Sequence, residues 1–336
     1  MRKPRETSPT IYDVASRAGL SISTVSRVLN APEQVNKGTR IKVLTAIDEL
    51  GYVPKAEARA RAMRGTNRIG VLTPFFTAPS FVQRLRGIDA ALAPSKYELI
   101  IYTVDSLDRL KGYLATLPLM GSLDGLIVMS LPVDEKDAER IRNAGLETVA
   151  IEYNIPDFSS VEIDDFQGGQ MAAQYLLNKG HRRIAFVGDI NPPDYAIRPV
   201  IFRYQGFQAA LMDAGVNLPE NYVISSWYDQ AHSRPAARRL LSLPEPPTAI
   251  FAAADIQAIA VMKVARDMGV KIPYDLAVLG FDDLDMAEYV GLSTIRQPLD
   301  DSGRIAAELL LNRLADPHRH PQHVNLPLTL IEREST

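Results

Sequence analysis

From Arg68 onward the chain repeats one pattern, in which a short apolar run is followed by an amphipathic stretch of helical length. Runs of this length are typical of strands that are buried on both faces of a parallel sheet, with crossover helices between them. The runs are RIGVLTP, YELIIYTVD, LDGLIVMS, ETVAIEY, RRIAFVGD, NYVISSW, PTAIFAAAD and LAVLGFDD. The alternation predicts an α/β fold with two doubly wound parallel sheets.

The predicted body, residues 68–336, divides into two subdomains. We expect the first to span about 68–163 and the second about 164–290. Residues 293–330, with a helix near 300–314, are expected to return to the first. Ligands of such folds bind at the carboxyl ends of the strands, where the two halves face each other.

Residues 1–51 predict a different unit, made of three short helices. Thr10 precedes an apolar-periodic run and Asp13 follows three residues later, which is typical of a capping box. Gly19 and Ser21 suit a tight turn before the second helix, and Gly51 suits the end of the third. The predicted helices span 11–18, 22–29 and 36–50, which together form a helix-turn-helix unit.

The second of these helices has one apolar and one polar side. Val25, Val28 and Leu29 follow the helical spacing of a buried face, whereas Ser23 and Arg27 lie opposite, with Ser26 and Asn30. An outward arginine can make paired hydrogen bonds to guanine in the DNA major groove, and Ile22 can touch a thymine methyl group. Residues 1–66 carry 12 Lys and Arg against 6 Asp and Glu, while the remainder carries 25 against 34. The basic surplus favours a DNA-binding surface over the alternative, a solvated face of a small helical cap.

Two segments of this unit, TIYDVASRAGLSISTVSRVLN and VNKGTRIKVLTAIDELGYVP, resemble the DNA-binding headpiece of the LacI/GalR (lactose and galactose repressor) family. The resemblance implies base contacts at Ile22, Ser23 and Arg27. It also implies phosphate contacts, at Thr10, Ser21, Thr24 and Asn30.

Residues 52–67 form a linker that is rich in Ala and Arg and predicts a marginal helix. The resemblance implies a hinge helix that enters the minor groove, where the family inserts a leucine. Arg61 occupies that position here. Arg61 can instead use the negative potential of a narrow groove, Met63 can supply an apolar wedge, or the segment is a plain flexible tether.

The body resembles the periplasmic-binding-protein fold of the same family. In RYQGF the resemblance implies a ligand arginine at Arg203, and in GFDD a ligand aspartate at Asp282; structural salt bridges are the alternative. These groups suit vicinal hydroxyls or a carboxylate. The family frequently has Asn where this chain has Ala254, which weakens inference about a particular sugar. Further candidates for the effector site are Ser80, Phe81, Glu152, Trp227 and Asp255, with Phe75, Phe76 and Tyr228 as stacking surfaces.

The chain has no cysteine, which excludes disulfides and thiolate metal sites, and it lacks the motifs of phosphate loops, acyl-transfer and zinc enzymes. We expect no catalytic residues, metal or cofactor. No secretory signal or membrane span is evident, so a cytoplasmic protein is expected. The sequence predicts a homodimeric repressor that binds a pseudo-palindromic operator and a small molecule, a sugar or oligosaccharide. The alternatives are a regulator activated by a non-sugar corepressor, and an enzyme or sugar-binding module with an accessory N-terminus.

Overall fold

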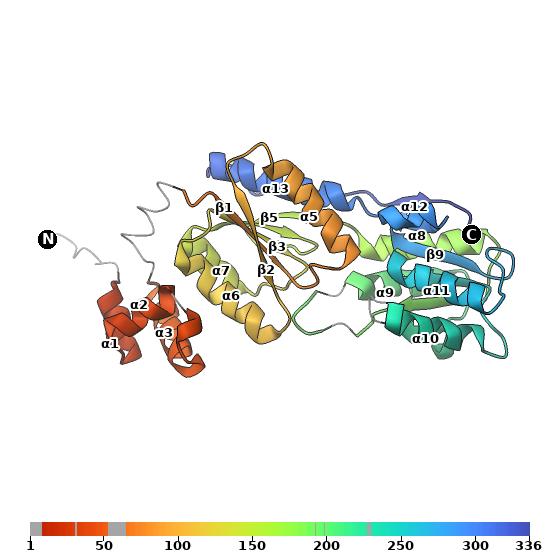
Figure 1. Ribbon diagram of the computed structural model, residues 1–336, viewed down its shortest axis with the longest axis horizontal. Coiled ribbons are helices and arrows are strands. Elements are labelled where there is room, and N and C mark those ends of the chain that lie inside the picture. The colour runs from red at the N-terminus through yellow and green to blue at the C-terminus, as the bar shows by residue number, and fades with distance from the viewer. Residues whose placement is uncertain (1–8, 31, 53–64, 192, 198, 227–229) are drawn as a thin grey trace.

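A computed structural model describes residues 9–30, 32–52, 65–191, 193–197, 199–226 and 230–336. A three-helix headpiece lies at one end of an elongated body, and the body consists of two α/β subdomains in line with it (Figure 1). Within the described residues, no helix is both long and apolar enough to cross a lipid bilayer.

The headpiece contains α1 (Ile11–Ala18), α2 (Ile22–Asn30), a short 3-10 turn (Pro32–Gln34) and α3 (Lys37–Leu50). The predicted capping box is confirmed, because the backbone N–H of Asp13 donates to Thr10 Oγ1 and the Asp13 carboxylate accepts from the Thr10 N–H. Gly19 and Gly51 end α1 and α3 with left-handed backbones. Local capping therefore defines this unit residue by residue.

The first subdomain is built on a sheet with the strand order β11-β5-β4-β3-β1-β2. All its pairings are parallel, as the buried apolar runs predict. Its strands are β1 (Arg68–Thr73), β2 (Glu98–Thr103), β3 (Gly125–Met129), β4 (Glu147–Ile151), β5 (Ser159–Glu162) and β11 (His323–Asn325). Its helices are α5 (Pro79–Leu92), α6 (Leu107–Met120), α7 (Glu135–Ala144) and α13 (Leu299–Ala315).

The second subdomain has the strand order β12-β10-β9-β8-β6-β7, parallel except for β12 against β10. Its strands are β6 (Ile184–Gly188), β7 (Val223–Ser225), β8 (Ala249–Ala252), β9 (Ala277–Asp282), β10 (Ser293–Arg296) and β12 (Thr329–Ile331). Its helices are α8 (Asp165–Asn178), α9 (Pro199–Asp213), α10 (Gln230–Leu241), α11 (Asp255–Asp267) and α12 (Asp285–Tyr289), with a 3-10 turn at Glu220–Tyr222.

The assignment of residues 293–330 to the first subdomain was wrong at both ends. β10 pairs in parallel with β9, so the chain is still in the second sheet at Arg296, and β12 pairs with β10 in that same sheet. Only α13 and β11 return to the first subdomain. The chain crosses between the two halves near residues 163, 297 and 327, because β5, β10 and β11 each end at that boundary.

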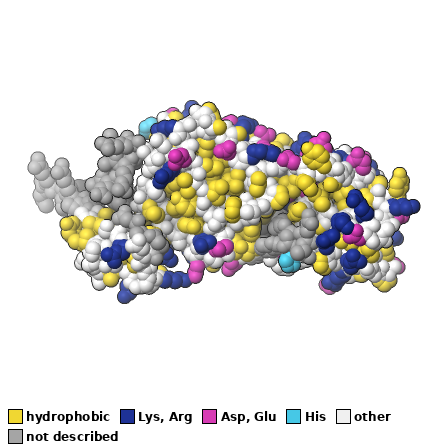
Figure 2. Space-filling view, in the orientation of Figure 1, with side chains coloured by type: hydrophobic (Ala, Val, Ile, Leu, Met, Phe, Trp, Pro, Cys, Tyr) yellow, Lys and Arg dark blue, Asp and Glu magenta, His cyan; other side chains and the backbone are white. Residues whose placement is uncertain are grey.

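β2 is an edge strand, and the exposed side chains near it include apolar ones. Figure 2 shows hydrophobic side chains gathered over the first subdomain, in the region of β1, β2 and α5. Val82 of α5 is 50% exposed and Ile101 of β2 is 40% exposed, and we call these two residues the apolar patch. An exposed edge strand with apolar side chains is a surface that another chain can cover.

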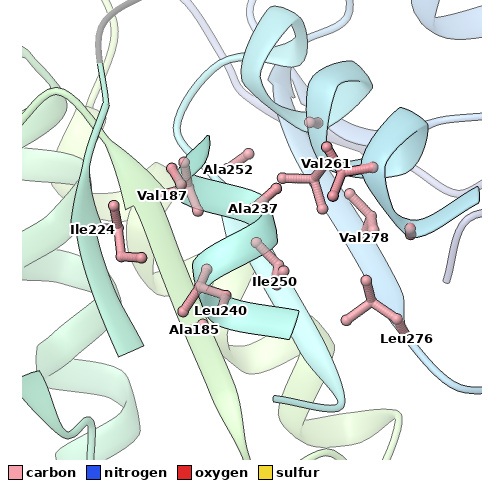
Figure 3. Packing of buried hydrophobic residues seen from close by; sticks show 14 of the residues in the cluster. Ala185, Val187, Ile224, Ala237, Leu240, Ile250, Ala252, Val261, Leu276 and Val278 are labelled. Carbon is pink, nitrogen blue, oxygen red and sulfur yellow. The ribbon is translucent and has the colours of Figure 1, made fainter. Parts of the chain in front are cut away.

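One hydrophobic cluster of the second subdomain lies between its sheet and the helices α10 and α11, and another packs against α8 and α9. In Figure 3, small and branched side chains of β6, β8 and β9 meet Ala237 and Leu240 of α10 and Val261 of α11. Each of these three helical side chains is fully buried. This packing fixes the positions of the carboxyl ends of these strands, where ligand-binding residues are expected.

The headpiece packs directly against the first subdomain. Leu119 of α6 belongs to the hydrophobic cluster of the headpiece. The guanidinium of Arg140 on α7 donates to both carboxylate oxygens of Asp48, with Nη2 at 2.9 and 2.8 Å, and Lys37 Nζ donates to Asp108 Oδ2 at 2.6 Å. The side chain of Arg140 is only 9% exposed, so the Asp48–Arg140 pair is largely shielded from water.

Candidate functional site

The polar side of α2 is presented to solvent. Val25 and Val28 are buried against α1 and α3, whereas Ser23 and Arg27 are exposed and Ile22 is 40% exposed. The helical spacing of the sequence therefore places the predicted base-contact residues on one outward surface. Asn30 ends α2, and its side chain lies outside the described residues, so its phosphate contact stays a prediction.

Hydroxyl groups surround the start of α2. Ser21 Oγ lies 2.9 Å from Ser23 Oγ and 2.8 Å from Thr24 Oγ1, and it accepts from the Thr24 N–H at 3.2 Å. Thr10 Oγ1 donates to Asp13 Oδ2 at 2.6 Å at the start of α1. Hydroxyls next to the free N–H groups of a helix N-terminus suit a phosphate oxygen.

A second candidate site is a cavity between the two subdomains, which contains about 690 Å³ of space not filled by atoms. Its lining comes from both subdomains and from the crossing segment at Gln297: Phe75, Ala78, Pro79, Ser80, Phe81, Arg84, Ser130, Glu152, Ala196, Ile197, Pro199, Arg203, Ala254, Ile256, Asp282, Leu284 and Gln297. The predicted residues Ser80, Phe81, Glu152, Arg203 and Asp282 are thus brought together.

Three residues of this lining have left-handed backbones at the carboxyl ends of strands. Ser130 follows β3 with φ 57°, Glu152 follows β4 with φ 66°, and Asp282 ends β9 with φ 118°. Non-glycine residues seldom adopt such angles, and they occur where a site requires a particular side-chain direction. The strain therefore coincides with the cavity.

Arg203 is buried in the wall that the second subdomain contributes. Its Nε donates to Asp165 Oδ1 at 2.7 Å and its Nη1 donates to the Ala253 carbonyl oxygen at 2.8 Å. Its guanidinium lies over the ring of Phe281, 3.8 Å from the centroid. These contacts hold the planar group in one orientation, as a site for bidentate recognition needs.

Asp282 forms an ion pair with Arg203 but no hydrogen bond at this distance, because Asp282 Oδ1 is 3.9 Å from Arg203 Nη1. The same oxygen accepts from Gln297 Nε2 at 2.5 Å. Burial raises the pKa of Asp282 to about 6, although Arg203 and Gln297 act in the opposite direction. The carboxylate is therefore poised to accept hydrogen bonds from a ligand near neutral pH.

The wall of the first subdomain carries a buried pair that the sequence analysis missed. Arg84 on α5 donates through Nη2 to Glu152 Oε1 and, at 2.9 Å, to Gln297 Oε1. Ser130 Oγ donates to the other oxygen of Glu152. Glu152 lines the cavity, yet both of its oxygens are occupied by protein donors. The signal in the sequence was present, because Arg84 begins an Arg-x-x-Gly pattern like that of Arg203.

Asp255 does not line the cavity, contrary to the prediction. It is fully buried, and it accepts from the Leu284 N–H at 2.7 Å and from Thr294 Oγ1 at 2.6 Å. Burial, together with the neighbouring Asp282, raises the pKa of Asp255 well above its ordinary value. Asp255 therefore ties the loop after β9 to α11, and Ala254 beside it reaches the cavity instead.

Of the remaining predicted residues, Phe75 lines the cavity and packs edge-on against Phe81, with ring centroids 5.7 Å apart. Phe76 is 42% exposed and is not part of the lining. Arg61, Met63, Trp227 and Tyr228 lie outside the described residues, so their roles stay predictions.

Comparison with known families assigns both parts of the chain. Residues 10–55 match bacterial regulatory proteins of the lacI family, and residues 173–336 match the periplasmic binding protein-like domain. The first match covers the headpiece and the second covers the second subdomain with the C-terminal segment.

Individual relatives extend the similarity over nearly the whole chain. The ribose operon repressor of Escherichia coli K12 is 33% identical over 332 residues, covering 97% of this chain and 99% of the repressor. A solved complex of the transcriptional regulator CelR with cellobiose is 31% identical, with a TM-score of 0.71 and coverage of 98% of this chain and all of that one. A LacI family regulator from Enterococcus faecium with bound ribose is 31% identical, with a TM-score of 0.70, covering 80% of this chain and 98% of that one.

Proposed function

The chain belongs to the lacI family of bacterial regulatory proteins, and from that premise we propose that it is a repressor that reads a pseudo-palindromic operator and responds to a neutral sugar in the cytoplasm. The observation that carries this proposal is α2, whose apolar side is buried while Ile22, Ser23 and Arg27 remain outward. A helix with such a side enters the major groove in helix-turn-helix proteins.

A genomic selection with the purified protein tests the DNA-binding part of this proposal. We expect enrichment of one pseudo-palindromic site, with half-sites about one helical turn apart. Footprinting should then show protection of both half-sites. Equal, salt-sensitive retention of every fragment would instead indicate a polyanion-binding surface without base readout, and would contradict the proposal.

A neutral sugar is the effector that best fits the cavity. Among the residues that the structure describes, its charged lining consists of two arginines, Arg84 and Arg203, and two carboxylates, Glu152 and Asp282, whose formal charges balance. The lining also offers the rings of Phe75 and Phe81, which suit the apolar face of a sugar. The relatives with bound ribose and cellobiose support the same class.

A thermal-shift series with D-ribose, cellobiose and other neutral sugars tests the effector. A ligand that binds only the folded protein raises the melting temperature as its concentration increases. The sugar that does so should also change operator affinity, and the direction of that change distinguishes an inducer from a corepressor. Stabilisation by purine bases or organic acids alone would contradict the sugar proposal.

We further propose that the protein acts as a homodimer through the apolar patch. Val82 and Ile101 are exposed beside the open edge of β2, and a second copy of the chain would cover them. Sedimentation of the wild-type protein should give a dimer, whereas I101D should shift it towards monomer because a charge would be buried in the interface. M212D, on an exposed position of α9, is the control. A wild-type monomer, or a dimeric I101D variant, would contradict this surface.

A further inference from the structure

The two subdomains carry the same short pattern at equivalent places. Arg84-Leu-Arg-Gly87-Ile88 lies in α5, and Arg203-Tyr-Gln-Gly206-Phe207 lies in α9. In each case the glycine touches the backbone of a second helix. A Cβ atom on Gly87 would lie 1.9 Å from the Asp300 carbonyl oxygen, and one on Gly206 would lie 1.9 Å from that of Phe166.

The contact is reciprocal in both subdomains. A Cβ on Gly303 of α13 would lie 2.0 Å from the Arg84 carbonyl oxygen, and one on Gly169 of α8 would lie 1.9 Å from the Arg203 carbonyl oxygen. Each arginine is thus carried on a backbone segment that is pressed against the neighbouring helix. The pairs α5–α13 and α8–α9 therefore hold their arginines in the same way.

The surroundings of the two arginines also correspond. Arg84 is 2% exposed and Arg203 is 4% exposed, and both line the cavity. Each donates to a carboxylate near a chain crossing, Glu152 or Asp165. Each also lies over a phenylalanine ring, at 5.8 Å for Arg84 over Phe81 and 3.8 Å for Arg203 over Phe281. The cavity therefore has one fixed guanidinium on each wall.

Arg84 has donor capacity that the protein does not use. Its Nη2 meets Glu152 and Gln297, but its Nε is buried and donates to no group in the described part of the chain. Glu152 accepts from Arg84 Nη2 and from Ser130, but not from Arg84 Nε. A buried donor without an acceptor is unfavourable, so Arg84 keeps hydrogen-bonding capacity unused beside the cavity that it lines.

We propose that Arg84 is the effector contact of the first subdomain and the counterpart of Arg203, so that one sugar accepts hydrogen bonds from both walls of the cavity. This inference rests on the proposed sugar-regulated function. A ligand that bridges two walls favours the closed arrangement of the subdomains over the open one.

Gln297 connects the two halves of this arrangement. Its Oε1 accepts from Arg84 and its Nε2 donates to Asp282, so the amide links α5 to the end of β9. Arg84 and Asp282 therefore share one orientation of Gln297. We therefore expect the site to prefer a sugar that places an acceptor oxygen next to Arg84. A deoxy analogue that lacks this oxygen should bind more weakly.

Calorimetry on the full chain tests the inference with a panel of neutral aldopentoses and aldohexoses and their deoxy analogues. The variant is R84M/E152Q, which removes both charges of the buried pair and leaves neither unpaired. We expect its affinity for the sugar that binds best to the wild type to fall by about 10- to 100-fold. A deoxy analogue that binds the wild type more weakly than its parent sugar should bind the variant with the same affinity as that parent sugar. A purely structural role of Arg84 would lower the affinity for both ligands and keep the difference between them.

Two further variants keep the test decisive. R304M removes an exposed arginine of α13 and should bind as the wild type does. R84K retains the charge without the planar fork, and it should bind more weakly than the wild type even if R84M/E152Q does not fold. Wild-type affinity in R84M/E152Q or R84K would overturn the proposed role of Arg84 but leave the sugar proposal standing. A wild type that binds no sugar of the panel would overturn the sugar proposal together with this inference.

Discussion

We expect effector binding to depend on pH through Asp282. Burial raises its pKa to about 6, and the ionised carboxylate accepts a hydrogen bond from a sugar hydroxyl more strongly than the protonated acid does. We expect the affinity for the effector to rise between about pH 5 and pH 7 and to level off above, because the carboxylate is then ionised. Isothermal titration across this range measures the affinity, and a flat profile would indicate that the effector does not donate a hydrogen bond to Asp282.

The same group influences stability in the opposite sense. The pKa of Asp282 in the folded protein lies above its ordinary value of 3.8, so the folded state binds more protons than the unfolded state between about pH 4 and pH 6. Stability without effector should therefore decrease as the pH rises through this window. D282N should flatten this part of the melting-temperature profile.

Arg27 is the residue at which base recognition is tested. R27A should weaken operator binding by about 1–3 kcal/mol and relax the preference at one base position, while binding to random DNA changes little. K42A is the control, because it removes one exposed positive charge from α3. Equal losses on operator and random DNA in R27A would show that Arg27 contacts phosphate.

At the level of single residues, the sequence predicts what local rules determine. Thr10 and Asp13 cap α1 because the pattern itself places them in contact, and Arg203 and Asp282 were found because they lie in recognisable motifs. Arg84 was missed because the residues around it in α5 have the pattern of a helix that only packs against the sheet. Asp255 was assigned to the site by its place in the family resemblance, and its burial was not foreseen because its partners Leu284 and Thr294 lie about 30 to 40 residues further along the chain.

The paired helices of each subdomain depend on glycine at their contacts. G303A should lower the free energy of unfolding by about 1–3 kcal/mol or more, because its Cβ would lie 2.0 Å from the Arg84 carbonyl oxygen. G112A in α6 is the matched control, since a Cβ there meets no atom within 4 Å. It should be neutral or stabilising by about 0.5–1 kcal/mol. Chemical denaturation of both variants measures the difference, and a neutral G303A would show that the helices separate freely.

Among the elements, the strands with apolar runs were predicted, whereas β10 and β12 were assigned to the wrong subdomain. β10 consists of Ser293, Thr294, Ile295 and Arg296, which has too little apolar character to identify a sheet. Its membership of the second sheet follows from pairing with β9, which is a non-local property.

On the scale of the whole molecule, the pair Asp48–Arg140 joins the headpiece to the body. D48N and R140Q should each weaken this docking by about 1–3 kcal/mol, and the double variant should lose no more than either single one. Faster amide hydrogen exchange in α3 and α7 reports the loss. R17Q, which breaks an ion pair within the headpiece, should leave α7 unchanged. Additive effects of D48N and R140Q would show that the two residues act independently.

The order of the elements along the chain has a consequence for biosynthesis. The headpiece ends at Tyr52 and depends mainly on contacts between its own helices, whereas β11 and β12, which complete the two sheets, come only at residues 323–331. On the ribosome, the DNA-reading module can therefore fold well before either sheet is complete. A transcript with a premature stop codon just upstream of β11 would encode a finished module joined to two unfinished halves.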